Sequence, residues 1–347
     1  MAFRYIGSKA RVVETIMDHI GSPDGGTFID AFCGTGAVAE SASRRGWPVS
    51  VNDHLNSATT TALARVTSEG QVPFQAFGGY ARAVQALNSV PGREGFVWRE
   101  YTPASRLHAG VARLYFTEDN ARRIDGMRAA IRDWTASGHL NPREEGLLLA
   151  DLMGAANRVA NTAGTYGCFL STWQRGSQET LRIEARILPH RLPPSTLTVG
   201  DVRDVPCQPE DTVYLDPPYT KRQYAAYYHV IETIALGDEP QVEGVCGIRP
   251  WRHIASDYCY KSRAVRALSE LVAGLPARRV FLSYSTEGHV PLDRLTEALT
   301  GKGRVVLHTL GDVGRYRPNQ AASDASAVVG EVLISVERPA SAVRVAA

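Results

Sequence analysis

An apolar run at residues 27–32 leads into a turn with two glycines, Gly34 and Gly36, and a helical stretch follows. A second apolar run at 48–52 and a second helical stretch from Leu55 come next. Strand and helix signals that alternate in this way are typical of βαβ units, in which parallel strands are covered by helices. The N-terminal segment therefore predicts the start of an open α/β sheet.

The pattern then changes to irregular glycine, proline and aromatic residues, followed by arginine-rich amphipathic stretches at 118–135 and 143–160. Strand signals resume at 195–199, 212–215, 279–284, 304–309 and 328–336. We expect one discontinuous sheet domain, formed by residues 1–70 and 196–340, with residues 71–195 inserted as a mostly helical region. Insertions of this length are usually functional.

The composition limits the classes of partner and site. A formal net charge of +2 does not require a nucleic-acid partner, so any basic surface must be local. The five scattered cysteines form no C-x-x-C pair, which indicates neither a disulfide framework nor a zinc site and favours a reducing compartment. The sequence has no signal-peptide core and no run near the roughly 18 apolar residues of a membrane span. We expect a soluble cytoplasmic protein that needs no metal.

The glycine turn is suited to a cofactor crevice. The first strand ends in Asp30, and Gly34 and Gly36 have no Cβ to keep a ligand from the backbone. A G-x-G spacing without a third glycine or a following Lys-Ser/Thr argues against a dinucleotide fingerprint and a P-loop. Asp53 ends the next strand, where its carboxylate is placed to accept ribose hydroxyls. An ordinary strand–helix turn with a solvated acid would give the same pattern.

The string Asp216-Pro217-Pro218-Tyr219 follows the short apolar strand at 212–215, at the strand end where open α/β sheets bind ligands. It suits an aromatic amine such as adenine N6, whose lone pair is delocalised into the ring. Asp216 and the Pro217 carbonyl would each accept an amine proton and direct the lone pair at a methyl sulfonium. The prolines stiffen the loop, and Tyr219 offers a stacking surface for an extruded base. A plain proline turn is the alternative.

Together these motifs resemble the Dam-like (alpha-group) adenine-specific DNA methyltransferases of restriction-modification type. The likeness also includes residues 4–9, Gly200-Asp201 and the strand at 280–284. It implies a Rossmann-like sheet that uses S-adenosyl-L-methionine, with residues 71–195 as an inserted target-recognition region. The implied reaction is methyl transfer to N6 of a flipped-out adenine in double-stranded DNA. The protein would then be the partner of a cognate restriction endonuclease or a solitary methylase.

The resemblance also implies roles for individual residues. The catalytic residues are Asp216, Pro217, Pro218 and Tyr219. The cofactor contacts are Tyr5, Lys9, Asp30, Phe32, Gly34, Gly36, Asp53, Asp201 and Asp216. The segments with Arg222 and Tyr224 and with Arg315 and Arg317 resemble parts of the family that could contact DNA. Arg158 and Arg175 are expected to bind DNA because they belong to a locally basic stretch of the insertion.

Simpler interpretations of several residues remain open. Lys9 would also fit a solvated helix start, and the aromatic residues around Tyr224 would also fit core packing. The arginines of the insertion would also fit an ordinary helical cap, and the segment with Arg315 and Arg317 would also fit a solvated hairpin tip. His229 is expected to be a satisfied helix histidine rather than a general base.

Other functions use related loops. N4-cytosine DNA methylation involves the same kind of amine, although Asp rather than Ser before the two prolines favours adenine. A methyltransferase for RNA or a protein amide, and a non-catalytic regulator that binds DNA or cofactor, are the remaining alternatives.

Overall fold

A computed structural model describes residue 7 and residues 9–312 and 330–339 of the 347. The described residues divide into two compact units. A helical unit contains those of Met1–Gly7, Leu55–Leu192 and Ala225–Ile254, and a sheet unit contains those of Ser8–His54, Pro193–Tyr224 and Ala255–Ala347. Among the described residues, no helix combines the length and the apolar character that a membrane span requires.

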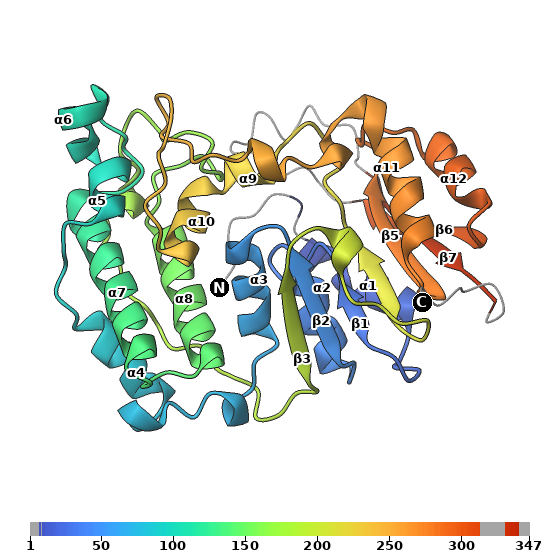
Figure 1. Cartoon of the computed structure of the whole chain (residues 1–347), viewed down its shortest axis with the longest axis horizontal. Helices are drawn as coiled ribbons and strands as arrows, with labels where there is room; N and C mark the ends of the chain where they lie inside the picture. The colour runs from blue at the N-terminus through green and yellow to red at the C-terminus, as the bar shows by residue number, and fades with distance from the viewer. Residues whose placement is uncertain (1–6, 8, 313–329, 340–347) are drawn as a thin grey trace. The chain divides into compact units, whose positions relative to one another are not determined.

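The sheet unit is built on seven strands in the order β3-β2-β1-β4-β5-β7-β6 (Figure 1). Their bounds are β1 Phe28–Asp30, β2 Val49–Asp53, β3 Ser195–Val199, β4 Thr212–Leu215, β5 Arg279–Ser285, β6 Arg304–Asp312 and β7 Gly330–Glu337. The first five strands of this order are parallel, whereas β7 is antiparallel to both β5 and β6. This arrangement confirms the predicted α/β class.

The strand order reverses at β1, which pairs with β2 on one side and with β4 on the other. A reversal of this kind opens a crevice at the carboxyl ends of the strands, where α/β proteins bind their ligands. Asp30 ends β1, Asp53 ends β2, and Asp216 follows β4. The topology therefore brings the three acids that the sequence singled out to one edge of the sheet.

Helices of the sheet unit are α1 Val13–Ile20, α2 Ala37–Arg44, α11 Lys261–Gly274 and α12 Leu292–Thr300. One face of the sheet, with side chains such as Val213 and Leu215, forms a buried core with Leu268 of α11 and Leu295 of α12. Apolar burial of this kind is the main source of the unit's stability.

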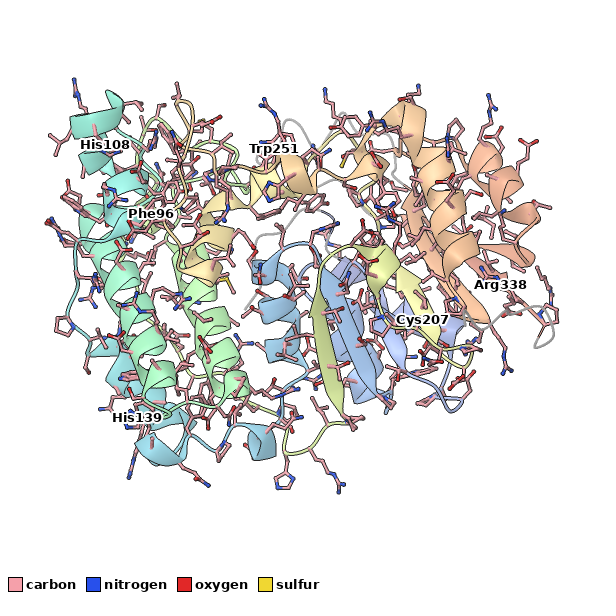
Figure 2. The ribbon with its side chains drawn as sticks, in the orientation of Figure 1. Phe96, His108, His139, Cys207, Trp251 and Arg338 are labelled. Atoms are coloured by element: carbon pink, nitrogen blue, oxygen red, sulfur yellow. A yellow bond between two sulfur atoms is a disulfide. The ribbon has the colours of Figure 1, made fainter. Side chains whose placement is uncertain are left out.

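The C-terminal end of α11 is capped by Arg338, which follows β7 and is labelled in Figure 2. Its guanidinium donates to the carbonyls of Val272, Leu275 and Ala277, and its Nε donates to the carbonyl of Lys302. A cation at a helix C-terminus satisfies carbonyls that have no partner within the helix. Arg338 thereby fixes the connection between α11 and the antiparallel edge of the sheet.

Helices of the helical unit are α3 Asn56–Arg65, α4 Tyr80–Asn88, α5 Phe96–Tyr101, α6 Arg106–Ala109, α7 Glu118–Ala136, α8 Pro142–Arg158 and α10 His229–Leu236. The short helix α9, Tyr224–Tyr227, lies where the chain passes from one unit to the other. α7 and α8 run side by side (Figure 1). Asn141 and Glu144 form a capping box at the start of α8, and Pro142 occupies the first helical position between them. Both features favour a sharp helix start.

The division into units differs from the domain boundaries expected from the sequence, because residues 55–70 and 225–254 lie in the helical unit. A long-range cap is one reason. The carboxylate of Glu232 in α10 accepts hydrogen bonds from the backbone N–H groups of Asn56 and Ser57 at 2.9 and 2.8 Å. It thus takes the role of an N-cap for α3 from 175 residues away. The role of residues 71–195 in target recognition remains a prediction.

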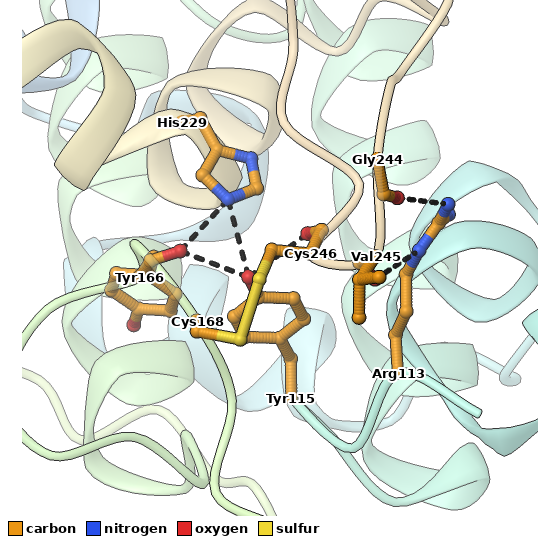
Figure 3. Close-up of a disulfide and its surroundings, with 8 residues drawn as sticks. All are labelled: Arg113, Tyr115, Tyr166, Cys168, His229, Gly244, Val245 and Cys246. Carbon is orange, nitrogen blue, oxygen red and sulfur yellow. Dashed lines mark hydrogen bonds between the residues drawn. A yellow bond between two sulfur atoms is a disulfide. The ribbon is translucent and has the colours of Figure 1, made fainter. Parts of the chain in front are cut away.

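The helical unit contains a disulfide between Cys168 and Cys246, shown in Figure 3. The expectation of no disulfide is wrong for this pair. The Tyr115 hydroxyl lies 2.9 Å from the carbonyl oxygens of both Tyr166 and Cys246, and its one proton is shared between these two acceptors, which brings the two loops together. A separation of 78 residues without a motif carries no sequence signal for this proximity. The other three cysteines, Cys33, Cys207 and Cys259, are unpaired.

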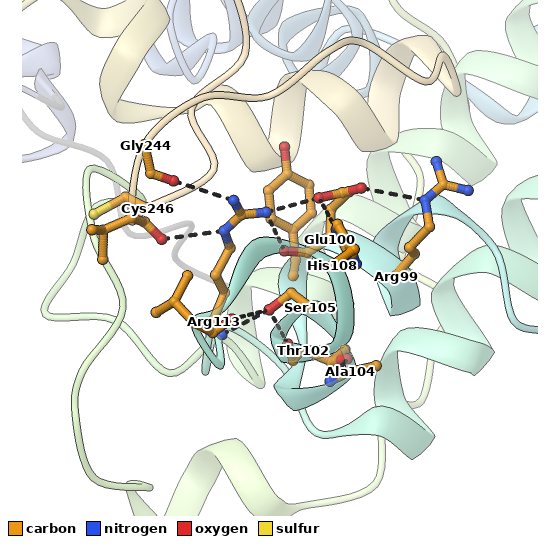
Figure 4. Close-up of polar contacts among 12 residues, drawn as sticks. Arg99, Glu100, Thr102, Ala104, Ser105, His108, Arg113, Gly244 and Cys246 are labelled. Atoms are coloured by element: carbon orange, nitrogen blue, oxygen red, sulfur yellow. Dashed lines mark hydrogen bonds and ion pairs between the residues drawn. The ribbon is translucent and has the colours of Figure 1, made fainter.

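A buried arginine fixes the same loop from its other side (Figure 4). The guanidinium of Arg113 pairs with the carboxylate of Glu100 at 2.8 Å and donates to the carbonyls of Gly244 and Val245, each at 3.2 Å. Arg113 is 3% exposed, so these contacts replace the hydration that its charge loses. The loop is held by its backbone, while the Val245 side chain stays exposed.

Candidate active site

The glycine turn is bonded to the end of the neighbouring strand. Gly34 and Gly36 both have positive φ angles, 48° and 75°, a conformation that favours glycine. The Gly34 N–H donates to Asp53 Oδ2 at 3.1 Å, and the Cys33 N–H donates to the Asn52 carbonyl at 2.9 Å. The predicted crevice acid therefore lies directly against the predicted glycine turn.

Asn52, which the sequence argument passed over, organises this edge of the sheet. Its side-chain amide donates to the Ala31 carbonyl at 3.1 Å and to the Gly200 carbonyl at 3.4 Å, and its oxygen accepts from the Thr198 hydroxyl at 2.9 Å. Asn52 is 2% exposed. Asn52 thus joins the ends of β1, β2 and β3. In the sequence, the only signal for this role is its position just before Asp53 at the end of a strand.

Asp30 is a buried acid with one oxygen left over. Its Oδ2 accepts the N–H of Ala39 at 3.2 Å, whereas its Oδ1 has no hydrogen-bond partner among the described residues. Burial, together with the nearby Asp216, raises the pKa of Asp30 to about 8. A buried carboxylate of this kind is suited to binding a cationic group, which would satisfy the oxygen and favour ionisation.

Lys9 lies against the predicted catalytic loop. Its ammonium is 3.0 Å from Asp216 Oδ1, 3.5 Å from Glu331 Oε2 and 5.2 Å from the centroid of the Tyr219 ring. The lysine is 5% exposed, and the neighbouring carboxylates raise its pKa although burial opposes them. Burial raises the pKa of Asp216, and the Lys9 ammonium opposes that shift. Lys9 was expected as a cofactor contact, and its pairing with Asp216 had no sequence signal.

Tyr219 is held at several points. Its hydroxyl donates to Glu331 Oε1 at 3.3 Å, its ring packs edge-on against Tyr284 with 5.6 Å between centroids, and its carbonyl accepts from the N–H of His289. Pro217 is buried, and Pro218 is partly exposed. The loop after β4 is thus held in place at Tyr219, and its two prolines restrict its backbone further.

Two further predicted cofactor contacts have neighbours that the sequence did not indicate. The Phe32 ring meets Tyr258 edge-on with 5.5 Å between centroids. Asp201 forms an ion pair with Arg203 at 2.5 Å, and this contact lowers the pKa of Asp201. Burial is the main cause of the raised pKa of Tyr258, and the negative charge of Asp201 is a second cause. Tyr258 is therefore a candidate site residue that the motifs missed.

The predicted DNA-binding residues are mostly exposed. Arg158, Arg175 and Arg222 have exposed side chains, and Tyr224 is half-buried at the start of α9. Arg158 also donates to the Arg182 carbonyl at 2.7 Å. The remaining predictions, Tyr5, Arg315 and Arg317, fall outside the described residues.

His229 is a satisfied core histidine, which confirms the expectation from sequence. It is fully buried, and its Nε2 lies 2.8 Å from the Tyr166 carbonyl (Figure 3). Burial lowers the pKa of His229 to about 3, so the ring is neutral at ordinary pH. It supports the loop around Tyr166 rather than acting as a base.

Comparison with known proteins provides an independent test. A model of the family described as D12 class N6 adenine-specific DNA methyltransferase matches residues 5–289. Type II methyltransferase M.FokI of Planomicrobium okeanokoites is 30% identical over 309 residues, 86% of this chain and 47% of the relative. Modification methylase LlaI of Lactococcus lactis subsp. lactis is 32% identical over 312 residues, 85% and 48% of the two chains. Type II methyltransferase M.NlaIII of Neisseria lactamica is 29% identical over 312 residues, 86% and 88%. The chain thus spans about half the length of the first two relatives.

Proposed function

The chain belongs to the D12 class N6 adenine-specific DNA methyltransferases, and on this premise we propose that it methylates N6 of a specific adenine in double-stranded DNA. The observation that carries the proposal is the meeting of Asp30, Asp53 and Asp216 at the reversal of strand order. The family implies a methyl donor, and we propose S-adenosyl-L-methionine. Its sulfonium supplies the electrophilic methyl group.

The residues around the crevice fit this donor. Asp30 Oδ1 is a buried acceptor without a partner among the described residues, which suits an α-ammonium group. Asp53 ends β2 beside the glycine turn, where it would accept ribose hydroxyls. The turn at Gly34 leaves room for close approach to the backbone.

The amine chemistry falls to the loop after β4. Asp216 would accept one proton of the target amine, and Lys9 favours the ionised carboxylate that this requires. The carbonyl of Pro217 is proposed as the second acceptor, so that the nitrogen lone pair points at the methyl group. Tyr219 presents the ring against which the extruded base would stack.

The exposed arginines of the helical unit, Arg158 and Arg175, and Arg222 near the catalytic loop are proposed to contact phosphates. Residues 71–195 would select the target sequence. The relatives' names describe type II methyltransferases and modification methylases, which supports a role as the modification enzyme that protects DNA from a cognate endonuclease.

Labelled donor and a randomised duplex library test the proposal. The protein should label DNA, and digestion to nucleosides should give N6-methyladenine. Asp216→Ala should lower the rate by at least about 10²-fold, since preorganised groups in such sites contribute at least that much. Asp293→Ala, which removes an exposed acid of the sheet unit, is the matched control and should leave the rate unchanged. N4-methylcytosine as the product, stronger labelling of RNA, or full activity of Asp216→Ala would contradict the proposal.

A further inference from the structure

Glu331, at the start of β7, contacts Lys9 and Tyr219 of the proposed active site, although β7 lies beyond β5 in the strand order. Because β7 is antiparallel to β5, the first residues of β7 lie at the same sheet edge as the last residues of β5 and β4. Glu331 pairs directly with Ser285, the last residue of β5. Its neighbour Val332 belongs to the core with α11 and α12, so strand alternation turns Glu331 to the opposite face. It lies beyond residues 5–289, which the family model matches.

The carboxylate of Glu331 contacts two groups of the proposed active site at once. Oε1 accepts the hydroxyl of Tyr219 at 3.3 Å, and Oε2 lies 3.5 Å from the ammonium of Lys9. The side chain is 8% exposed, so water does little to screen these contacts. A buried acid at a strand end is costly unless it is paired. The Tyr219 hydroxyl bonds to Oε1 and the Lys9 ammonium offsets the charge, whereas Oε2 has no hydrogen-bond partner among the described residues.

Lys9, Asp216 and Glu331 form a cluster of charged groups, and Glu331 changes the net charge of this cluster. Lys9 alone with Asp216 would make a neutral pair. With Glu331 ionised, the three groups sum to one negative charge. During methyl transfer, positive charge moves from the donor sulfur to the amine nitrogen beside Asp216. A net negative cluster at that place stabilises the charge where it arrives, and does so in a site shielded from water.

We propose that Glu331 is a positioning residue for methyl transfer, which orients the Tyr219 ring through its hydroxyl and shares the Lys9 ammonium with Asp216. The inference rests on the proposed function of the chain as a DNA methyltransferase. Its charge makes the group of Lys9, Asp216 and Glu331 net negative, and its hydrogen bond acts through Tyr219. These two effects are separable by substitution.

Three variants separate the charge from the hydrogen bond. Glu331→Gln keeps an oxygen for the Tyr219 hydroxyl and removes the charge, Tyr219→Phe removes the hydroxyl alone, and Glu331→Ala removes both. Glu337→Gln, at the exposed other end of β7, is the matched control. Glu331→Gln should lower kcat about tenfold, which corresponds to about 1.4 kcal/mol, with little change in the KM for DNA. The acidic limb of its pH–rate profile should move to lower pH, because a like charge near Asp216 is gone.

The hydrogen bond between Tyr219 and Glu331 can be tested by measuring extrusion of the target base. In a duplex with 2-aminopurine at the target position, Glu331→Ala and Tyr219→Phe should weaken the fluorescence change to a similar degree. Combined with Tyr219→Phe, Glu331→Ala should then have no further effect on this signal. The proposal would be overturned if Glu331→Gln had the same kcat and the same acidic limb as Glu337→Gln. It would also be overturned if the effects of Glu331→Ala and Tyr219→Phe on the fluorescence change were fully additive.

A readout without DNA separates this inference from the proposed function. Calorimetry compares the affinity for S-adenosyl-L-methionine with that for its neutral demethylated product, S-adenosylhomocysteine. Glu331→Gln should reduce the preference for the cationic ligand several-fold, and Glu337→Gln should not. If the wild type methylates no DNA while this difference is present, the proposed function fails and the electrostatic role of Glu331 stands. An unchanged preference in an active enzyme would remove that role.

Discussion

Lys9 and Asp216 form a buried ion pair, with Nζ 3.0 Å from Oδ1. The pair joins a 3-10 turn near the N-terminus to the residue that follows β4, across 207 positions of the chain. An isolated carboxylate in such a place would favour its neutral form, which is a weaker hydrogen-bond acceptor and carries no charge to stabilise the positive charge that develops on the amine. Lys9 therefore keeps the proposed catalytic acid in its useful state.

Replacement of Lys9 tests this dependence. In Lys9→Met the pKa of Asp216 should rise, because burial then acts without the opposing cation. The acidic limb of the pH–rate profile should move to higher pH, and the rate at neutral pH should fall by about 10²-fold. Lys261→Met, which removes an exposed lysine of the sheet unit, is the control. An unshifted acidic limb in Lys9→Met would show that Lys9 does not set the ionisation of Asp216.

The raised pKa of Asp30 should make the stability of the folded protein depend on pH. Its pKa is about 8 in the folded protein against an ordinary value of 3.8, so between these pH values the folded state holds a proton that the unfolded state has released. Stability should therefore fall as pH rises from about 4 to about 8, and Asp30→Asn should remove that part of the slope. Urea unfolding of both proteins across this range measures the difference. Equal slopes would contradict the assignment.

The same substitution bears on the methyl donor. A cationic ligand favours ionised Asp30, so Asp30→Asn should weaken S-adenosyl-L-methionine binding by about tenfold or more, the equivalent of one lost charge-assisted hydrogen bond. Asp24→Asn, an exposed acid of the sheet unit, serves as the control. Retained affinity would place the ammonium of the donor elsewhere.

Local patterns predicted the fold well. The β1–turn–α2–β2 segment and the loop after β4 were visible in sequence because strands, glycine turns and prolines are specified by near neighbours. The antiparallel placement of β7 was not visible, since it depends on pairing across the sheet. For the same reason the motifs marked Asp30, Asp53 and Asp216 but gave no signal for Glu331 or for the cap that Glu232 places on α3.

Arg222 should contribute to DNA affinity through phosphate alone. Its side chain is exposed, and the segment is held by Gln223, whose amide exchanges hydrogen bonds with the backbone of Ser256 at 2.9 and 3.2 Å. Arg222→Ala should weaken binding to all duplexes alike and reduce the slope of log K against log salt by about one. Arg266→Ala, an exposed arginine paired with Glu270, should change neither quantity. Lost discrimination between sequences would instead indicate a base contact.

The disulfide of the helical unit should make its stability sensitive to reductant. Disulfides typically contribute about 2–4 kcal/mol, and the bond between Cys168 and Cys246 closes a long loop. The double substitution Cys168→Ser and Cys246→Ser should lower the unfolding midpoint in oxidising buffer to that of the reduced wild type. Cys207→Ser, which removes an unpaired thiol, should leave the reductant effect in place. Alkylation of unfolded, unreduced protein should modify three cysteines, and modification of all five would show that the pair is not bonded.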